Sequence, residues 1–421
     1  MELKSLIPIY IISVNSILKM LFFALISHCF SDTWAVIFCG SNSYYNYRHT
    51  ADVYNQYQLL IKGGINQSHI ILMSYDDIVN SPENIYKGHI YRALDHGVDV
   101  YPGVENIDYI GNKVTAQNFF NVLTGNTTNG PALHSTAKDD VFVFYENHGG
   151  DQVLGVPDGC GDYIMANDLL QTLNVMHTKG MYKNLFFIIS SCYAGSIAEV
   201  IQNIPNIYFQ TSTGDEESSY AALYDQDLGV YLTEEYPLAK DNFIEISDSS
   251  ATIGDLFEYC SKNVPSSTVS EYGDLTLKNL PLYNFFGVHD KSDRINPKAH
   301  QKVEIKSSST KAIKTEIELS TKENKINNLR KSRMMVSYVA EQISEFRLNQ
   351  IMNGLKNKFS ITENLNKPCK NLNSKAYKKV LQALQKSLNR LGESFYEYSF
   401  FFSNLASSYE TSDIVEEIYK L

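Results

Sequence analysis

A chain of 421 residues is long enough to form one large α/β domain and a second, smaller domain. Its formal net charge of −11 is unevenly distributed: residues 1–290 carry a net −20, whereas residues 291–421 carry 23 Lys and Arg against 14 Asp and Glu, a net +9. An acidic body followed by a basic tail favours electrostatic pairing within the chain over nucleic-acid binding, with two independently solvated surfaces as the alternative.

The first 31 residues have the pattern of a targeting segment. Lys19 precedes an apolar run that starts at Met20 and has the length of a signal-peptide core. Neither this run nor the apolar stretch at residues 6–12 reaches the ~18 apolar residues that span a bilayer. We therefore expect a signal peptide over residues 1–31, with Met20 as the alternative start and a retained membrane anchor as the alternative interpretation.

Apolar segments alternate with helical patterns through the first half of the chain, which predicts a mostly parallel sheet with helices on both faces. The expected strands are Ala35–Gly40, Ile70–Ser74, Val141–Tyr145, Leu185–Ser190 and Ile207–Thr211. The expected helices are Arg48–Lys62, Thr115–Leu123, Ala166–Thr178 and Ser196–Ile204.

Two of the expected strands lead into reactive side chains, one into His148-Gly149 and the other into Cys192. Because chemistry in an open α/β sheet gathers beyond the carboxyl ends of the strands, we expect both side chains at the same edge. A thiol is only a few per cent ionised at neutral pH, and a nearby His that takes its proton makes it an effective nucleophile. The pattern predicts Cys192 as nucleophile and His148 as general base, against a structural Cys and a loop His.

Gly149 has no Cβ, so its backbone N–H can approach a substrate carbonyl closely. With the N–H of Cys192 it would form an oxyanion hole for the tetrahedral intermediate. No Cys-x-x-Cys pair is present, which argues against a zinc site, and the sequence implies neither a metal nor a cofactor.

The cysteines and two glycosylation sequons fit a secretory route. Asn66 and Asn126 each begin an acceptor sequence for N-glycosylation. Cys39 lies in an apolar strand as expected core packing, and no spacing among the remaining cysteines dictates a disulfide bond: Cys160, Cys260 and Cys369.

The strand-end segments resemble those of the legumain (asparaginyl endopeptidase) family, in the caspase-like clan of cysteine peptidases. Further matching motifs follow in the same order over roughly residues 33 to 285: Ser41–His49, Met73–Ile78, Val98–Val104 and Glu217–Ala221. The resemblance implies a caspase-like α/β fold and hydrolysis of peptide bonds after Asn, with Asp as the alternative, through a Cys/His thioester mechanism. It also implies that Asn46 orients the His148 imidazole.

The substrate pocket of that family combines an Arg, the adjacent His, a Ser and two acidic residues. The resemblance assigns the first three roles to Arg48, His49 and Ser218. The acids do not match: Ser190 stands where the family has Glu, and Glu234 stands where the family has Asp. We therefore expect an Arg48 with less charge compensation and a relaxed preference for Asn over Asp.

Residue 147 also departs from the family pattern, since Asn147 precedes the expected base where the family has Asp.

The composition changes after the peptidase-like domain expected at residues 32–290. Residues 291–333 carry charge with little to bury, which predicts an exposed linker. In residues 334–421, apolar positions recur at three- and four-residue steps, which predicts a helical bundle. One expected seam comprises Tyr377, Leu381, Leu384, Leu388, Leu391, Phe395 and Tyr398, and a second comprises Met335, Val339, Ile343 and Phe346.

The resemblance assigns the helical region the role of a prodomain that caps the active site of a zymogen. Prodomains in the family are usually disulfide-bonded, whereas this tail has only Cys369. We expect the tail to be released on acidification and the linker to be cut by the protein itself after one of three residues, Asn324, Asn327 or Asn328.

The signal peptide and the resemblance predict the partners of the protein and its cellular destination. Its partners would be protein or peptide substrates and its own C-terminal domain, with no nucleic acid and no stable membrane span. Its destination would be the secretory pathway, leading to a lysosome or vacuole or to secretion.

Two other functions compete with an active peptidase. The catalytic subunit of the glycosylphosphatidylinositol transamidase shares the fold and the Cys/His pair, but the Glu-Ser-Ser-Tyr segment looks like legumain. A legumain-like binding protein with little or no activity is the second, and the retention of every catalytic element argues against it.

Overall fold

The computed structural model describes residues 32–288, 328–388, 391–392 and 394–421. The chain divides into two units, and all described residues from Thr33 to Leu421 belong to the second. The expected signal peptide and most of the expected linker lie outside the described residues. Within the described parts, no helix combines the length and the apolar character needed to cross a membrane.

A six-stranded sheet forms the centre of the fold, in the order β11-β8-β7-β3-β1-β2. Its strands are β1 (Thr33–Cys39), β2 (Ile70–Met73), β3 (Asp140–Glu146), β7 (Asn184–Ser190), β8 (Ile207–Thr211) and β11 (Ser270–Gly273). All neighbours are parallel except β11, which runs antiparallel to β8. Near-continuous apolar runs suit strands that are covered on both faces, so the expected parallel sheet is confirmed.

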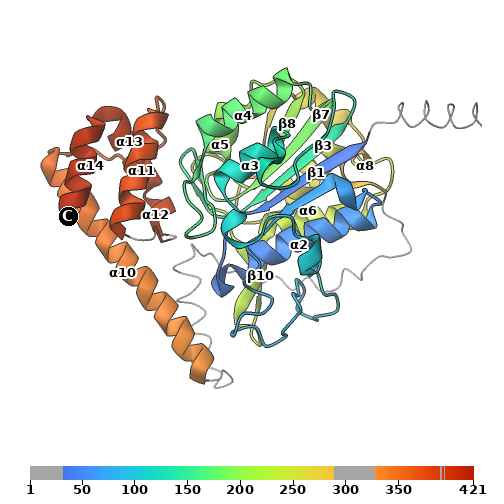
Figure 1. The fold of residues 1–421 in the computed structure, drawn as a ribbon, viewed down its shortest axis with the longest axis horizontal. Coiled ribbons are helices and arrows are strands. Elements are labelled where there is room, and N and C mark those ends of the chain that lie inside the picture. The colour runs from blue at the N-terminus through green and yellow to red at the C-terminus, as the bar shows by residue number, and fades with distance from the viewer. Residues whose placement is uncertain (1–31, 289–327, 389–390, 393) are drawn as a thin grey trace, which may run out of the picture. The chain divides into compact units, whose positions relative to one another are not determined.

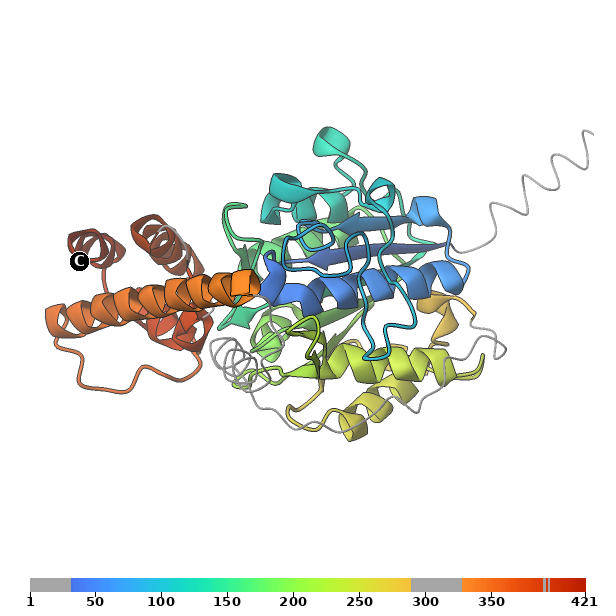
Figure 2. The same ribbon diagram turned by 90° about the horizontal axis from the view of Figure 1, so that it is seen from below.

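Helices cover both faces of the sheet (Figure 1). One core joins the sheet to α2 (Tyr47–Lys62), α6 (Glu235–Ile246), α7 (Ile253–Asn263) and α8 (Tyr283–Phe286). The other core joins it to α3 (Ala116–Leu123), α4 (Ala166–Thr178) and α5 (Ala194–Ile201). In Figure 2 the cyan α3 and the blue α2 lie on opposite sides of the blue strands.

Two small antiparallel sheets flank the carboxyl edge of the main sheet. The first contains β4 (Gly149–Gly150), β5 (Val153–Leu154) and β6 (Ile164–Met165). The second is a hairpin of β9 (Ala221–Asp225) and β10 (Val230–Glu234). Neither sheet was expected from the sequence, because β4, β5 and β6 have only two residues each and the hairpin strands carry no clear periodic pattern.

The C-terminal region is helical and has a core of its own. Its helices are α10 (Asn328–Lys358), α11 (Ser374–Leu388), α12 (Ser394–Glu397), α13 (Ser399–Ser408) and α14 (Thr411–Lys420). Helix α10 begins inside the range expected to be a linker.

Two details of the expected helical seams are corrected. The seam from Tyr377 to Tyr398 is divided, because α11 ends at Leu388 and Gly392 precedes the short α12. The stripe of Val339, Ile343 and Phe346 is exposed, with Phe346 64% accessible. The buried side of α10 consists instead of residues further along it, namely Leu348, Ile351, Met352 and Leu355.

Candidate active site

The pairing of β3 with β7 brings the expected base and nucleophile to one edge. Glu146 and Ser190 are Cα partners in the parallel register, and His148 and Cys192 each lie two residues beyond that pair. The loops they occupy touch: a Cβ at Gly149 would lie 2.6 Å from the Cys192 carbonyl oxygen and 2.7 Å from Ser191 Oγ. Only glycine allows this approach.

His148 is held from the direction of α2. Its Nε2 lies 2.9 Å from Asn46 Oδ1, and Asn46 Nδ2 in turn donates to the Asn42 carbonyl at 3.0 Å. Asn46 ends a 3-10 turn, Tyr44–Asn46, and immediately precedes α2, so its side chain projects at the helix start. The ring of His49 packs edge-on against the His148 ring with centroids 4.8 Å apart.

Cys192 is partly exposed at the end of β7, just before α5. The backbone N–H of Ser219 donates to its Sγ at 3.3 Å, and the Ser219 hydroxyl lies 3.5 Å from the same sulfur. Burial raises the pKa of the Cys192 thiol, and the hydrogen bonds from Ser219 and Ser218 oppose that rise. Ser218 therefore acts on the thiol, and Ser219, which the sequence reasoning missed, contacts it directly.

Three of the residues expected to line the substrate pocket, Arg48, His49 and Glu234, form a buried polar cluster. Arg48 Nε donates to Glu234 Oε1 at 2.6 Å, and His49 Nε2 lies 3.1 Å from the same oxygen. The other ring nitrogen of His49 lies 3.0 Å from Ser41 Oγ. Arg48 and His49 come from the first turn of α2, whereas Glu234 ends β10.

The electrostatics of this cluster follow from burial and from the Arg48 charge. Burial, reinforced by Arg48, lowers the pKa of His49 to about 3, so the imidazole is neutral. Burial acts to raise the pKa of Glu234, but the Arg48 charge and the hydrogen bonds to His49 and Arg48 together outweigh it and hold the pKa well below its ordinary range. The cluster is therefore a neutral His beside a tight Arg–Glu ion pair.

Two expected departures from the family pattern lie close to this cluster. Ser190 is fully buried at the end of β7. The Asn147 side-chain amide donates to the Gly40 carbonyl, which ties the loop after β3 to the loop after β1.

Among the described residues, one group of acidic and imidazole side chains has the spacing of metal ligands. Ligand atoms of His49, Glu146 and Glu234 all lie within 4.8 Å of one another. Glu146 was not singled out from the sequence, because it directly follows the expected strand Val141–Tyr145 and no motif gave it a role.

The C-terminal helices contact the loop that carries His148. The ring of Tyr396 lies almost parallel to the His148 ring, with centroids 5.8 Å apart and an interplanar angle of 27°. Leu391 and Tyr396 also line a pocket beside His148 together with Asn42 and Asn46.

Asp151 is the polar anchor of the same contact. Its N–H donates to Ser399 Oγ at 2.8 Å, and its carboxylate accepts from the Ser403 hydroxyl and, at 3.4 Å, from the Cys369 N–H. Burial raises the pKa of Asp151 to about 6.

The remaining residues singled out from the sequence lie away from the site or outside the described residues. Asn66 and Asn126 are exposed and each accepts a hydrogen bond from the residue two positions on, as the first residue of a short turn. Asn324 and Asn327 lie outside the described residues, and Asn328 is the first residue of α10. Five cysteines are free in the described parts: Cys39, Cys160, Cys192, Cys260 and Cys369.

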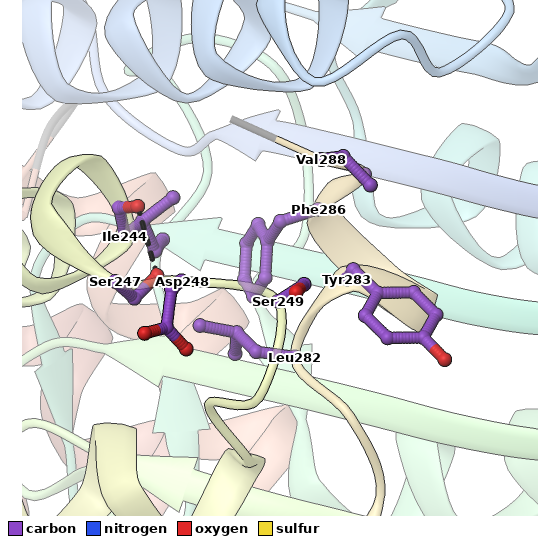
Figure 3. Close-up of a pocket in the computed structure, with 9 residues that line it drawn as sticks. Ile244, Ser247, Asp248, Ser249, Leu282, Tyr283, Phe286 and Val288 are labelled. Atoms are coloured by element: carbon purple, nitrogen blue, oxygen red, sulfur yellow. Dashed lines mark hydrogen bonds between the residues drawn. The ribbon is translucent and has the colours of Figure 1, made fainter. Parts of the chain in front are cut away.

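A second pocket lies near the opposite edge of the sheet. Asn284, which stands between the lining residues Tyr283 and Phe286, accepts a hydrogen bond from Thr33 at the start of β1. It is lined by the end of α6 and by α8 (Figure 3). Phe286 and Leu282 lie next to Asp248 there, and no cysteine or histidine joins the lining.

Comparisons with known proteins bear on this geometry. Residues 33–290 match the model of the Peptidase C13 family. The chain is 35% identical over 265 residues to legumain of Mus musculus, covering 61% of this chain and 59% of that protein. It is 37% identical over 281 residues to a vacuolar-processing enzyme of Vicia sativa, covering 62% and 56% respectively. It is 32% identical over 320 residues to legumain of Bos taurus, covering 73% and 71%. The aligned region thus spans little more than half the length of the first two relatives.

Proposed function

The chain belongs to the Peptidase C13 family, and on that premise we propose that it is a cysteine endopeptidase that hydrolyses peptide bonds after Asn. The observation that carries the proposal is the bond between His148 Nε2 and Asn46 Oδ1 at 2.9 Å, at the edge where Cys192 emerges from the adjacent strand. The names of the relatives, legumain and vacuolar-processing enzyme, support the same reaction class.

The hydrogen bond to Asn46 selects the His148 tautomer. An amide oxygen only accepts, so Nε2 carries the proton and Nδ1 is the nitrogen that takes the thiol proton. The Cys192 thiolate then attacks the carbonyl carbon of the substrate, the C–N bond breaks, and His148 returns the proton to the leaving amine. Water, deprotonated by His148, hydrolyses the thioester and regenerates the thiol.

The contact of Gly149 with the Cys192 loop supports an oxyanion hole at this point. The N–H groups of Gly149 and Cys192 would stabilise the negative oxygen of the tetrahedral intermediate, a contribution worth about 3 kcal/mol for one such donor elsewhere. Arg48 would donate to the side-chain oxygen of a substrate Asn, with His49 and Ser218 beside it.

Residues 334–421 are proposed as an inhibitory domain of a zymogen. The stacking of Tyr396 on His148 and the three bonds of Asp151 support this role, because both contacts occupy the loop that a substrate must reach. Release on acidification and self-cleavage after Asn324, Asn327 or Asn328 complete the proposal.

A secretory route to a lysosome or vacuole belongs to the same proposal, with residues 1–31 as its signal. Relatives named vacuolar-processing enzymes support this destination. Expressing the full chain in a eukaryotic cell and sequencing the N-terminus of the mature protein tests it, and a protein that keeps its first 31 residues would contradict it.

Turnover of an Asn-terminated fluorogenic peptide at acidic pH tests the chemistry. Wild-type activity should be blocked by a thiol alkylator and absent in Cys192→Ala. Cys160→Ser is the control, since this thiol is more buried than that of Cys192 and bonds to the Gly111 carbonyl, at 3.7 Å, instead of to Ser219. Full activity in Cys192→Ala would remove this thiol from the mechanism.

Acid incubation of wild type beside Cys192→Ala, followed by mass spectrometry, tests the zymogen. Wild type should yield fragments that end at residues 324–328, and the variant should stay intact. Identical fragmentation of both proteins would show that another protease makes the cut. Full activity of the intact chain at neutral pH would reject latency.

A further inference from the structure

Glu146 lies inside the polar cluster that would receive the substrate side chain, although no part of the proposed mechanism uses it. It ends β3, is 1% exposed, and lies on the face of the sheet that α2 covers, since it alternates with Phe142 and Phe144 of the first core. Its carboxylate lies within 4.8 Å of the ligand atoms of His49 and Glu234. Strand β3 thus supplies an acid to the cluster.

The partner of Glu146 across the sheet is Ser190, the residue whose lack of a carboxylate departs from the family pattern. The two residues are Cα partners in parallel strands, so their side chains leave the same face about 4.8 Å apart. A carboxylate absent from β7 is therefore present one strand away, at the same level along the sheet. A carboxyl group from β3 thus lies near His49 and Glu234, although β7 supplies none.

Two carboxylate oxygens in the cluster have no hydrogen-bond partner among the described residues. They are Glu146 Oε2 and Glu234 Oε2, one from β3 and one from β10. A buried polar atom without a partner costs about 1–3 kcal/mol and more when it is charged. In the ionised carboxylates both oxygens can accept a hydrogen bond, and an amide N–H supplies the donor.

We propose that Glu146 is a specificity-determining residue of this peptidase, replacing from β3 the carboxylate that Ser190 does not provide and selecting, with Arg48 and Glu234, an amide side chain over an acidic one. The inference rests on the proposed function and deepens it. Arg48 donates to the oxygen of the substrate amide, and the acidic side chains accept from its nitrogen. An Asp side chain has no donor for them and brings a like charge.

A divalent metal is the competing occupant of this cluster, and the charges disfavour it. The Arg48 guanidinium lies 2.6 Å from Glu234 Oε1 and already supplies the positive charge that a metal ion would bring. His49 Nε2, the imidazole ligand atom, is also engaged, lying 3.1 Å from the same oxygen.

The test measures kcat/KM for matched peptides ending in Asn and in Asp on acid-activated protein, with active sites counted by thiol alkylation. The proteins are wild type, Glu146→Gln, Ser190→Glu and the exchange variant that combines Glu146→Ser with Ser190→Glu. The matched control is Asp140→Asn, a buried carboxylate at the other end of the same strand that bonds to Asn184.

Glu146→Gln should lower the Asn-to-Asp ratio about tenfold or more, because a hydrogen-bonding pocket discriminates strongly through its buried polar groups. The exchange variant should restore the ratio to within about threefold of wild type, and Asp140→Asn should leave it unchanged. Ser190→Glu alone should not sharpen selection, because it places two carboxylates side by side.

An unchanged ratio in Glu146→Gln with a full count of active sites would overturn the proposal. Should that variant fail to fold, the exchange variant decides: a folded protein that has lost selection rejects Glu146 as the source of it. Zinc that raises the thermal midpoint of wild type but not of Glu146→Gln would assign the cluster to a metal and also overturn the proposal. A wild-type protein that cleaves no peptide would instead refute the peptidase function itself.

Discussion

Asn46 performs two tasks with one amide group. Its oxygen accepts from His148 Nε2, and its nitrogen donates to the Asn42 carbonyl, so the second bond fixes the orientation of the first. Asn46→Ala should lower kcat by about tenfold to a thousandfold with little change in KM, because the imidazole loses its preferred tautomer.

The control for this variant is Asn42→Ala, which removes a side chain of the same pocket that bonds to Asp158 instead of to the base. It should stay within about threefold of wild type, as an exposed contact does. Equal losses in both variants would mean that Asn46 supports only the loop. Steady-state kinetics on an Asn-terminated peptide measure both.

The pH dependence of Asp cleavage should report the ionisation of Glu146. Burial, followed by the charges of Asp52 and Glu234, raises the pKa of Glu146 well above its ordinary range, while Ser190 acts in the opposite direction and Cys39 adds a smaller rise. The neutral form therefore persists to higher pH than in a free Glu, and it repels an acidic substrate less.

Asp-terminated peptides should thus be cleaved relatively faster as the pH falls, and Glu146→Gln should flatten that dependence. The ratio of kcat/KM for Asp and Asn peptides between pH 4 and pH 7 measures this. A ratio in Glu146→Gln that rises as steeply as in wild type would attribute the effect to the substrate carboxyl alone.

At the scale of elements, the loop from β4 to β5 carries the contact that responds to pH. Burial raises the pKa of Asp151 to about 6, although the hydrogen bonds from Ser403 and Cys369 of the tail oppose the rise. An exposed Asp titrates near ~4, so docking of the tail takes up a proton between these values. This contact is therefore stable below ~4 and loses stability as the pH rises through about 6.

Asp151→Asn should bind the tail more tightly at neutral pH, by roughly 1–3 kcal/mol, because the amide is neutral and still accepts from Ser403. The gain should vanish below ~4. The rate at which iodoacetamide labels Cys192, followed by mass spectrometry, measures docking at both pH values. Faster labelling of the variant at neutral pH would contradict the assignment. This one contact opposes release on acidification, so other groups must provide the proposed trigger.

The long elements of the fold were predictable, and the short ones were not. The expected helix Ala166–Thr178 and the expected strand Ile207–Thr211 match the structure at both ends, because their apolar patterns are long or strongly bounded. The β9–β10 hairpin, which delivers Glu234, carries no such pattern. In α10, three- and four-residue spacing indicated a helix but chose the wrong face, since periodicity alone does not say what a helix packs against.

The candidate site shows the same division. Cys192 and His148 were singled out because strand-end motifs give each a chemical reason, whereas Asn46 came only from the family resemblance. Ser219 was missed because its main contribution is a backbone N–H, which any residue type provides. Glu146 was missed because its role depends on strand order: only the pairing of β3 with β7 places it beside Ser190.

At the scale of the whole molecule, the opposite net charges of the acidic body and the basic tail produce few direct ion pairs between the described residues. Between described residues, ion pairs across the two parts come from Lys378, which lies 2.8 Å from Asp168 and 3.9 Å from Asp162. Such partly exposed pairs contribute about 0–1 kcal/mol. Aromatic contacts accompany these ion pairs: the ring centroids of Tyr193 and Phe400 lie 5.2 Å apart.

Lys378→Ala should therefore speed the labelling of Cys192 at neutral pH by at most about fivefold, and added salt should remove the difference from wild type. Lys420→Ala is the matched control, because this lysine pairs with Glu416 inside its own helix. Equal effects of both variants would point to a general charge effect of the tail.

The contact between Tyr396 and His148 joins two parts of one chain, so docking of the tail depends on protein concentration only after the linker is cut. Domains joined by a chain meet one another at an effective concentration that reaches millimolar. At that concentration, a docking constant as weak as ~10 μM keeps about 99% of the molecules closed. Once the connecting chain is cut, the tail rebinds only at its bulk concentration. In a nanomolar solution of enzyme, far below this docking constant, the tail then dissociates almost completely. A single cut in the linker thus makes an effective intramolecular inhibitor negligible, because it lowers the effective concentration of the tail while every contact of the interface stays the same.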